Sequence, residues 1–279
     1  MLISNRITVK NLISFLLVLL VLSSITTIAE AAVPIPSGFQ IISQGAGVRV
    51  FRKTYSSGAP DYATVVDLRS ASISSFTGWV YGDPNGVIER RTLTTHWNNA
   101  VAQNTFSRSA KVAINGTFFV TEDTPNTGIA FGLKAGWWRM SYGYGLGEFP
   151  GLIRTLAFDS SFGSSSIQPY DRGTFDSGIP DVVGGLDPAA DKNKSSFIGR
   201  TFVGVRDDNG DGHSETVVFF SSASASQQWA VDILNGFGTG SKMMLDGGGS
   251  AGLIIDGEQN IMPSGDRTLP HVFIIWAGK

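Results

Sequence analysis

Short apolar stretches bounded by glycine, proline or serine recur along this chain, and they constrain its fold more than any other feature. From Phe39 onward, apolar and polar residues alternate in patches such as 48–51 and 62–68, with the period of two that β-strands show. Glycine supplies 34 of the 279 residues, only 16% of residues are charged, and long mid-chain helices rich in Glu and Lys are missing. The sequence therefore predicts an α+β fold, a single domain with a mixed β-sheet core and a few flanking helices.

The first 31 residues have the pattern of a secretory signal peptide. Two basic residues precede the apolar run 12–22, and Ala29-Glu30-Ala31 offers a small-x-small cleavage site. The run is shorter than the roughly 20 apolar residues that a membrane-spanning helix needs. We therefore expect a mature domain of residues 32–279 that has no membrane span and is secreted, to a periplasm or to the exterior.

A near-neutral charge and the absence of cysteine exclude several classes of function. A net charge of −2, with no basic cluster after the signal, offers no electrostatic footprint for nucleic acid or an anionic membrane. Without cysteine there are no disulfides and no thiolate metal ligands. His96, His213 and His271 lack the spacing of a transition-metal site. We expect no required cofactor, and the sequence does not indicate an oligomeric state.

Helices are expected in two segments, where apolar residues follow helical spacing: residues 93–106 and 225–237. Residues 202–205 and 216–220 are predicted to be strands of a hairpin with a turn-rich connection. Residues 111–115 are predicted to form a short buried strand.

Aromatic residues alternate with glycine between residues 128 and 151 without a regular period, so we expect hairpins and loops there. These residues fit two interpretations. They can form an aromatic core, or an exposed wall on which the C–H face of a sugar stacks. The sequence leaves both open for Trp137, Trp138, Tyr142, Tyr144 and Phe149.

The glycine-rich loop Asp246-Gly247-Gly248-Gly249-Ser250 is expected to organise the functional site, between two buried strands. Three consecutive glycines lose much backbone entropy on folding, so they are tolerated where φ is positive or another group approaches closely. Successive amide N–H groups can form an anion-binding concavity, and Asp246 can act as an acceptor or as an acid/base. A tight turn with a capping Asp is the alternative.

A nucleophile elbow is another interpretation of this loop. Residues 248–252 match G-x-S-x-G with Ser250 as nucleophile, and Asp256 or Asp266 followed by His271 completes the order Ser, Asp, His. An elbow requires a helix directly after the serine, whereas the next residues are predicted to be a strand. A serine hydrolase is therefore the less favoured alternative.

Asp207, Asn209 and Asp211 begin a possible calcium loop. Followed by a glycine, they match D-x-N-x-D-G, which places hard oxygen ligands at alternate positions. Val218 stands at position twelve, where a bidentate Glu is usual, so a solvated hairpin turn competes with a metal site. Any calcium would be structural, with Glu215 as a further ligand.

Three segments, in order, resemble the phosphodiester glycosidase family. Residues 115–119 (N-G-T-F-F) resemble its N-G-G-F-F, residues 199–204 (G-R-T-F-V-G) its P-R-T-A-I-G, and residues 245–250 its L-D-G-G-G-S. Weaker matches are a V-G-G at residues 183–185 and an acidic-Arg pair at residues 266–267. The resemblance covers about residues 110 to 279. Departures from the family pattern are Thr117 for a glycine, Gly199 for a proline and His271 for a small polar residue.

This resemblance implies a secreted bacterial hydrolase that cleaves a sugar-1-phosphodiester bond in an envelope or extracellular glycan. Its catalytic residues would be Asp246 as acid/base, Asn115 orienting a hydroxyl and Arg200 on the phosphate. Its substrate-binding residues would be Thr201, Gly247, Gly248, Gly249, Ser250, Arg267 and His271. The usual glycosidase scheme needs a second carboxyl, for which the candidates are Glu122, Asp123, Asp176 and Asp181. A phosphosugar-binding envelope protein without catalysis is the alternative.

Overall fold

The computed structural model describes residues 32–82 and 86–279. The predicted signal peptide, residues 1–31, lies outside the described residues. Val33–Lys279 forms one compact unit. Within the described part of the chain, no helix is both long enough and apolar enough to cross a membrane.

The described chain is mainly strands with three α-helices. The helices are α2 (Leu93–Val101), α3 (Arg172–Asp176) and α4 (Gln227–Gly236), and the 3-10 turns are η1 (Gly248–Ser250) and η2 (Ser264–Asp266). The strands are β1 (Gln40–Gly45), β2 (Val48–Lys53), β3 (Asp61–Asp67), β4 (Ala71–Thr77), β5 (Val80–Tyr81), β6 (Val87–Glu89), β7 (Arg108–Asn115), β8 (Asn126–Thr127), β9 (Leu133–Ala135), β10 (Trp138–Ser141), β11 (Ile153–Asp159), β12 (Ser164–Pro169), β13 (Asp181–Leu186), β14 (Ile198–Arg206), β15 (Thr216–Ala225), β16 (Lys242–Met244), β17 (Leu253–Ile255), β18 (Glu258–Ile261) and β19 (His271–Gly278).

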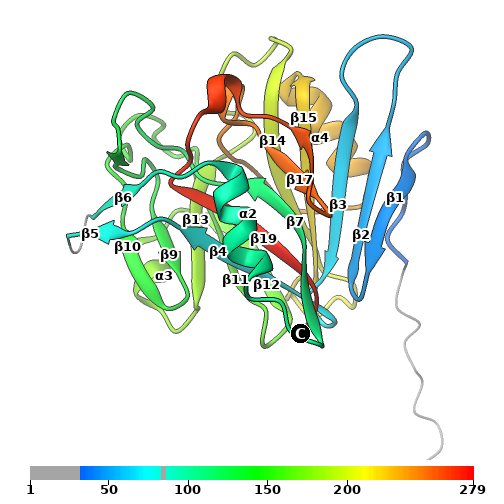
Figure 1. Cartoon of the computed structure of the whole chain (residues 1–279), viewed down its shortest axis with the longest axis horizontal. Coiled ribbons are helices and arrows are strands. Elements are labelled where there is room, and N and C mark those ends of the chain that lie inside the picture. Colours follow the sequence, from blue (N-terminus) through cyan, green and yellow to red (C-terminus); the bar gives the residue numbers. More distant parts are fainter. Residues whose placement is uncertain (1–31, 83–85) are drawn as a thin grey trace, which may run out of the picture. The chain divides into compact units, whose positions relative to one another are not determined.

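These strands form a large, a small and a three-stranded sheet (Figure 1). The large sheet has the order β1-β2-β3-β15-β14-β16-β13-β11-β12, and β9 pairs with both β13 and β10. The small sheet has the order β18-β17-β7-β19-β4, and the third is β5-β6-β8. We expected a mixed sheet, but the ladders between described strands run antiparallel. Hairpins such as β11–β12 and β14–β15, whose strands pair antiparallel with each other, account for part of this pattern.

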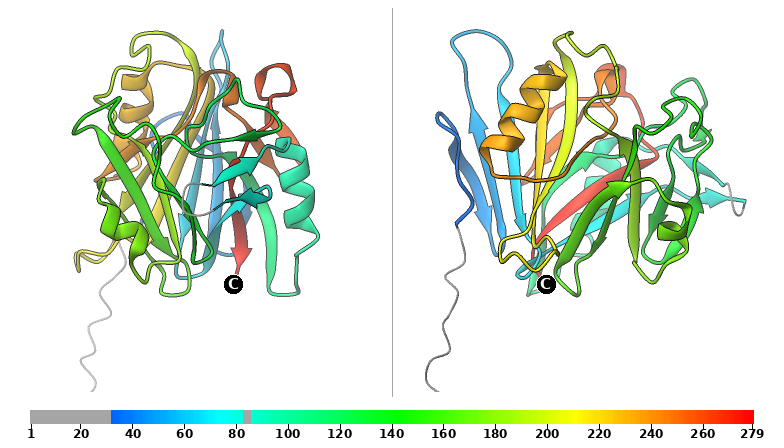
Figure 2. Two further views of the ribbon diagram at one scale, coloured as in Figure 1. Left: turned by 90° about the vertical axis from the view of Figure 1, so that its left-hand side faces the viewer. Right: turned by 180° about the vertical axis from the view of Figure 1, so that it is seen from behind.

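The main core lies between the large and the small sheet. Alternate residues of a strand point to opposite faces, so Phe219 of β15 faces Phe273 of β19, with ring centroids 5.1 Å apart. Phe202 and Phe220 face the other way, into a second core beneath α4. Helix α2 packs on β7, β17 and β19, and Figure 2 shows α2 and α4 on opposite sides of the paired sheets. The predicted flanking helices are confirmed.

Both predicted helices exist, with shorter bounds than expected. Thr92 caps α2 by accepting the Thr95 N–H at 3.1 Å. The helix ends at Val101 rather than near residue 106, because Asn104 accepts the N–H of Ala110 at 2.7 Å and turns the chain into β7. The predicted hairpin of residues 202–220 is confirmed as β14 and β15.

The two strands that flank the glycine-rich loop belong to different sheets. β16 lies between β14 and β13 of the large sheet, whereas β17 lies between β18 and β7 of the small one. The loop therefore carries the chain across from one sheet to the other, and sequence patterns did not reveal this.

Candidate active site

At each of the three loop glycines, a different steric constraint disfavours a side chain. A Cβ on Gly247 would lie 2.6 Å from the carbonyl oxygen of Gly199. Gly248 has φ +57°, in the left-handed region. A Cβ on Gly249 would lie 3.1 Å from the guanidinium carbon of Arg267. The loop is thus pressed between β14 on one side and Arg267 on the other.

Asn115, at the end of β7, fastens the loop at both of its ends. Its Oδ1 accepts the Thr201 hydroxyl at 2.6 Å and the Gly252 N–H at 3.1 Å. Its Nδ2 donates to the carbonyl of Asp246 at 2.6 Å. Asn115 and Thr201 are both fully buried. We expected Asn115 to orient a substrate hydroxyl, but these contacts make it a positioning residue for the loop.

Asp246 combines a shielded carboxyl group with nearby positive charge. Its Oδ1 accepts the Gly247 N–H at 2.9 Å, while Oδ2 is shielded from solvent and accepts no hydrogen bond from the described residues. Burial raises the pKa of Asp246 to about 6, against the lowering effects of Ser250, the Gly247 amide, Arg267 and Lys192. A carboxyl with this pKa can gain or lose a proton close to neutral pH, as acid/base catalysis requires.

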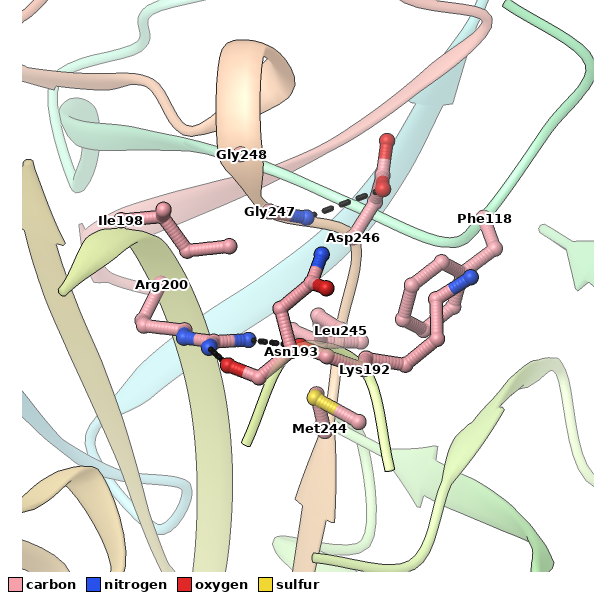
Figure 3. A pocket seen from close by; sticks show the side chains of 10 residues that line it. All are labelled: Phe118, Lys192, Asn193, Ile198, Arg200, Met244, Leu245, Asp246, Gly247 and Gly248. Carbon is pink, nitrogen blue, oxygen red and sulfur yellow. Dashed lines mark hydrogen bonds between the residues drawn. The ribbon is translucent and has the colours of Figure 1, made fainter. Parts of the chain in front are cut away.

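Asp246 lines an open cavity of about 140 Å³ (Figure 3). This volume is that of a few water molecules, enough for a small polyatomic group. Its walls come from the 192–193 loop, the start of β14, the end of β16 and the glycine-rich loop. The lining residues are Phe118, Lys192, Asn193, Ile198, Arg200, Met244, Leu245, Asp246, Gly247 and Gly248.

Arg200 borders this cavity, but its guanidinium is committed to backbone carbonyls. Nε donates to Ala225 at 3.1 Å and Nη1 to Lys192 at 2.8 Å. Nη2 donates to Asn193 at 2.6 Å and to Ser196 at 3.2 Å. We expected Arg200 to contact the phosphate. These bonds instead give Arg200 the role of holding the 192–196 loop in place.

Lys192 is the cation of the cavity that sequence reasoning missed. Its backbone is held on both sides, since its carbonyl accepts from Arg200 and its N–H donates to Oε1 of Gln227 at 2.9 Å. Its Nζ lies 5.7 Å and 5.5 Å from the ring centroids of Phe118 and Phe149. Lys192 stands outside every recognised motif, so no signal in the sequence pointed to it.

Arg267 provides a second cation at the loop. Its Nη1 donates to the hydroxyl of Ser250 at 3.3 Å, and its other N–H groups have no acceptor among the described residues. The Ser250 N–H donates to the carbonyl of Gly247 at 3.0 Å. Within the described chain, the N–H groups of Gly248 and Gly249 also have no acceptor. The N–H groups of Gly247 and Ser250 are already bonded within the loop. Those of Gly248 and Gly249 therefore remain as possible donors to an anion.

Ser250, His271 and Asp256 of the alternative catalytic triad share no hydrogen bond in the described structure, and the side chain of the other candidate acid, Asp266, lies outside the described residues. The Nδ1 of His271, a fully buried side chain, accepts the Thr117 N–H at 3.2 Å. The carboxylate of Asp256 instead pairs with Lys111 at 2.7 Å. Strand β17, not a helix, follows the loop. These contacts give no support to Ser250 as a nucleophile.

His271 packs in the core rather than against a substrate. Gly116 passes so close that a Cβ there would overlap the imidazole. Burial lowers the pKa of His271 to about 3, so the ring stays neutral. Its expected role in substrate binding has no support from its position.

Two of the four candidate second carboxyls, Glu122 and Asp123, carry charges that act on the same tyrosine as the charge of Asp246. Arg90 fixes their loop by donating to the carbonyls of Thr121 at 2.8 Å and Asp123 at 2.5 Å. Burial is the largest cause of the raised pKa of Tyr144, and the charges of Asp123, Asp246 and Glu122 add to it. Glu122, Asp123 and Asp246 thus all contribute to the raised pKa of Tyr144, as Glu148 does.

The other two candidates lie in contacts of their own. Asp176 pairs with Arg139 at 2.6 Å and accepts the Tyr142 hydroxyl at 2.6 Å. Asp181 accepts the Gly136 N–H at 3.3 Å, and burial raises its pKa to about 6. Neither residue lines the Asp246 cavity.

The possible calcium loop is the turn between β14 and β15. Carboxylate oxygens of Asp207, Asp211 and Glu215 lie within 4.8 Å of one another. Asn209 donates to Asp211 at 3.1 Å and to Glu215 at 3.0 Å. The oxygen set is of the type that calcium prefers, and the same oxygens accept the hydrogen bonds of a hairpin turn. None of these residues lines the Asp246 cavity.

Some aromatic residues of the segment 128–151 lie in the core, and others are exposed as a sugar-stacking wall would require. Tyr142 is buried and Phe149 packs on Phe131, with ring centroids 6.1 Å apart. Trp137, Trp138 and Tyr144 are exposed. The expected hairpin in this segment is formed by β9 and β10.

Comparison with known proteins gives a relation at the level of the fold. No protein-family model and no curated protein matches the chain. The catalytic domain of zebrafish N-acetylglucosamine-1-phosphodiester alpha-N-acetylglucosaminidase, auto-inhibited by its pro-peptide, has a TM-score of 0.54 at 15% identity, over 85% of this chain and 87% of that one. A hypothetical protein from Synechocystis has a TM-score of 0.55 at 11% identity, over 87% of this chain and 69% of that one. At these identities the likeness shows a shared fold.

Proposed function

We propose that this protein is a glycosidase that hydrolyses the bond between a sugar C1 and the oxygen of a phosphodiester, with Asp246 as its acid/base. The observation that carries the proposal is the Asp246 carboxyl. One of its oxygens accepts no hydrogen bond from the described residues, its pKa is raised, and it lies beside a cavity with cationic and N–H donors. The zebrafish enzyme of the same fold bears the name of a phosphodiester glycosidase, which supports the assignment.

The phosphate would be held by groups on either side of Asp246. The positive charges of Arg267 and Lys192 both lower the pKa of Asp246. The N–H groups of Gly248 and Gly249 belong to the same glycine-rich loop as Asp246. Positive charge and amide dipoles placed at the leaving group stabilise the charge that develops there. This replaces Arg200 by Lys192 in the expected phosphate site.

In the reaction, ionised Asp246 would take a proton from a water molecule while the oxygen of that water attacks C1. The bond from C1 to the phosphate oxygen breaks, and its electron pair leaves with the phosphate. The products are the free sugar and a phosphomonoester. The phosphate group of that monoester, whose second pKa is near 6, can accept the proton that Asp246 took from the water. Because phosphate is a stable leaving anion, one carboxyl is sufficient, and Glu122 and Asp123 are available should protonation of that oxygen be needed.

We also propose that the natural substrate is a glycan of the cell envelope or the extracellular space, met after secretion. The composition carries no basic cluster for a polyanion, and a small cavity for one phosphate suits an isolated phosphodiester link.

The test is turnover of a panel of sugar-1-phosphodiesters by the purified protein, with release of the phosphomonoester followed by ³¹P NMR. We expect Asp246→Asn to abolish turnover. Absence of turnover across the panel, or an unchanged rate in Asp246→Asn, would contradict the proposal. Thermal stabilisation by a substrate without product would favour the binding-protein alternative, and covalent labelling of Ser250 by a fluorophosphonate would favour the serine hydrolase.

A further inference from the structure

Two exposed tryptophans from separate parts of the chain line one hollow. Trp79, just before β5, is 70% exposed, and Trp138, at the start of β10, is 65% exposed. The hollow has a volume of about 500 Å³, and we call it the indole groove. Its lining residues are Gly78, Trp79, Val80, Gly82, Trp138 and Met140.

Hydrogen bonds hold the backbone around the indole groove at Trp79 and at Met140. The Trp79 N–H donates to Oε2 of Glu89 at 3.2 Å. The Gly86 N–H donates to the carbonyl of Met140 at 3.0 Å, which joins the β5–β6 hairpin to β10. The segments that carry the two indoles are therefore linked by a backbone hydrogen bond.

The turn that precedes Trp138 is not the one that stability alone would choose. Gly136 and Trp137 both have positive φ, +54° and +74°, at the tip of the β9–β10 hairpin. For a non-glycine residue this conformation is strained, and Asn-Gly is the usual sequence at such a turn. Trp137 is also 63% exposed. Strain and exposed apolar surface at one place are marks of a binding site.

None of the residues that line the groove is charged, and the charged residues next to them in the chain are paired with one another. Glu89 pairs with Arg91 at 2.8 Å, and Arg139, which follows Trp138, pairs with Asp176 at 2.6 Å. Paired charges favour a neutral ligand over a phosphorylated or nucleic-acid one, which would need uncompensated cations. Indole faces fit the C–H faces of pyranose rings, which are themselves uncharged.

We propose that the indole groove is a second binding site, one that binds a neutral glycan chain by stacking sugar rings on Trp79 and Trp138. It is separate from the Asp246 cavity and involves no bond cleavage. The proposal goes beyond the hydrolase assignment and does not depend on it.

Binding is tested on the full chain with soluble β-1,4-linked hexasaccharides of glucose, N-acetylglucosamine and mannose, followed by tryptophan fluorescence. We expect at least one of them to bind, and Trp79→Ala and Trp138→Ala each to weaken that binding by about tenfold, as loss of an aromatic stack implies. Phe106→Ala, which removes another fully exposed aromatic ring, is the matched control and should bind like the parent. Unchanged thermal melting would show that the variants fold.

Three outcomes would overturn the proposal: none of the hexasaccharides binds, the tryptophan variants bind as tightly as Phe106→Ala, or the two tryptophans are needed instead for binding to phosphatidylcholine vesicles or for self-association in sedimentation. Failure of the hydrolase assignment would look different. In that case the groove variants would still lose glycan binding, while sugar-1-phosphodiesters would not be turned over even by the parent protein.

Discussion

The Oδ1 of Asn115 accepts the hydroxyl of Thr201 at 2.6 Å, and this bond joins β7 of the small sheet to β14 of the large one. Both side chains are fully buried. Because the same Asn115 also holds the carbonyl of Asp246, the position of the carboxyl depends on how the two sheets are held together.

Asn115→Ala should destabilise the protein by about 3 kcal/mol, since the buried Thr201 hydroxyl and Gly252 N–H each lose their acceptor at roughly 1–3 kcal/mol apiece. Urea denaturation measures the loss. Asn99→Ala, at an exposed position of α2, is the control and should change the free energy of unfolding little. Equal effects of the two substitutions would refute the proposed role of Asn115.

Gly199→Ala should displace the glycine-rich loop, because the added Cβ would lie 2.3 Å from the carbonyl oxygen of Gly248. We expect a lower melting temperature and loss of turnover together. Gly178→Ala, where a Cβ meets nothing within 4 Å, should leave both unchanged. A fully active Gly199→Ala protein would mean that the loop position does not matter for catalysis.

The rate should follow the ionisation of Asp246. With a pKa of about 6, the carboxylate that acts as base forms as pH rises, so kcat/KM should increase through about pH 6 and then level off. A phosphodiester keeps one negative charge throughout this range, so the substrate adds no ionisation of its own. A pH–rate profile measures this, and a rate that instead falls through pH 6 would assign Asp246 as the acid.

The same ionisation predicts an effect on stability. The folded-state pKa of Asp246 lies above the ordinary value of 3.8, so proton binding favours the folded state below about pH 4 and this contribution is lost as pH rises through about 6. The Asp246→Asn protein has no carboxyl to ionise at this position, so it does not lose this stability as the pH rises. Its melting temperature relative to the parent should therefore increase between pH 4 and pH 6 and then stay constant. A difference independent of pH would contradict the raised pKa.

Lys192→Met should raise KM for a sugar-1-phosphodiester by about tenfold, because a hydrogen bond to a charged group contributes roughly 1.5–3 kcal/mol. The melting temperature should hardly change, since Arg200 and Gln227 contact only the backbone of Lys192. Lys194→Met, two residues along on an exposed side chain that does not line the cavity, is the control. The same KM for both variants would remove Lys192 from the phosphate site.

Local sequence signals predicted much of what lies within one segment. The β14–β15 hairpin follows from alternation around a turn-rich connection, and α4 ends where Gly238 adopts φ +77°. Helix α2 was predicted too long, because the bond from Ala110 to Asn104 that ends it depends on how the chain re-enters the sheet. The glycine-rich loop was located correctly, although its crossing between sheets was not foreseen.

The sequence by itself determined where strands, turns and the glycine-rich loop occur, because backbone conformation at glycine and apolar alternation are local properties. Only the tertiary structure decided what the long side chains contact. The guanidinium of Arg200 donates to backbone carbonyls of residues 192, 193, 196 and 225. These bonds hold the loop that places Lys192 in the same cavity as Asp246. The partners of a buried guanidinium are set by segments distant in the chain, whose meeting depends on the packing of the whole sheet.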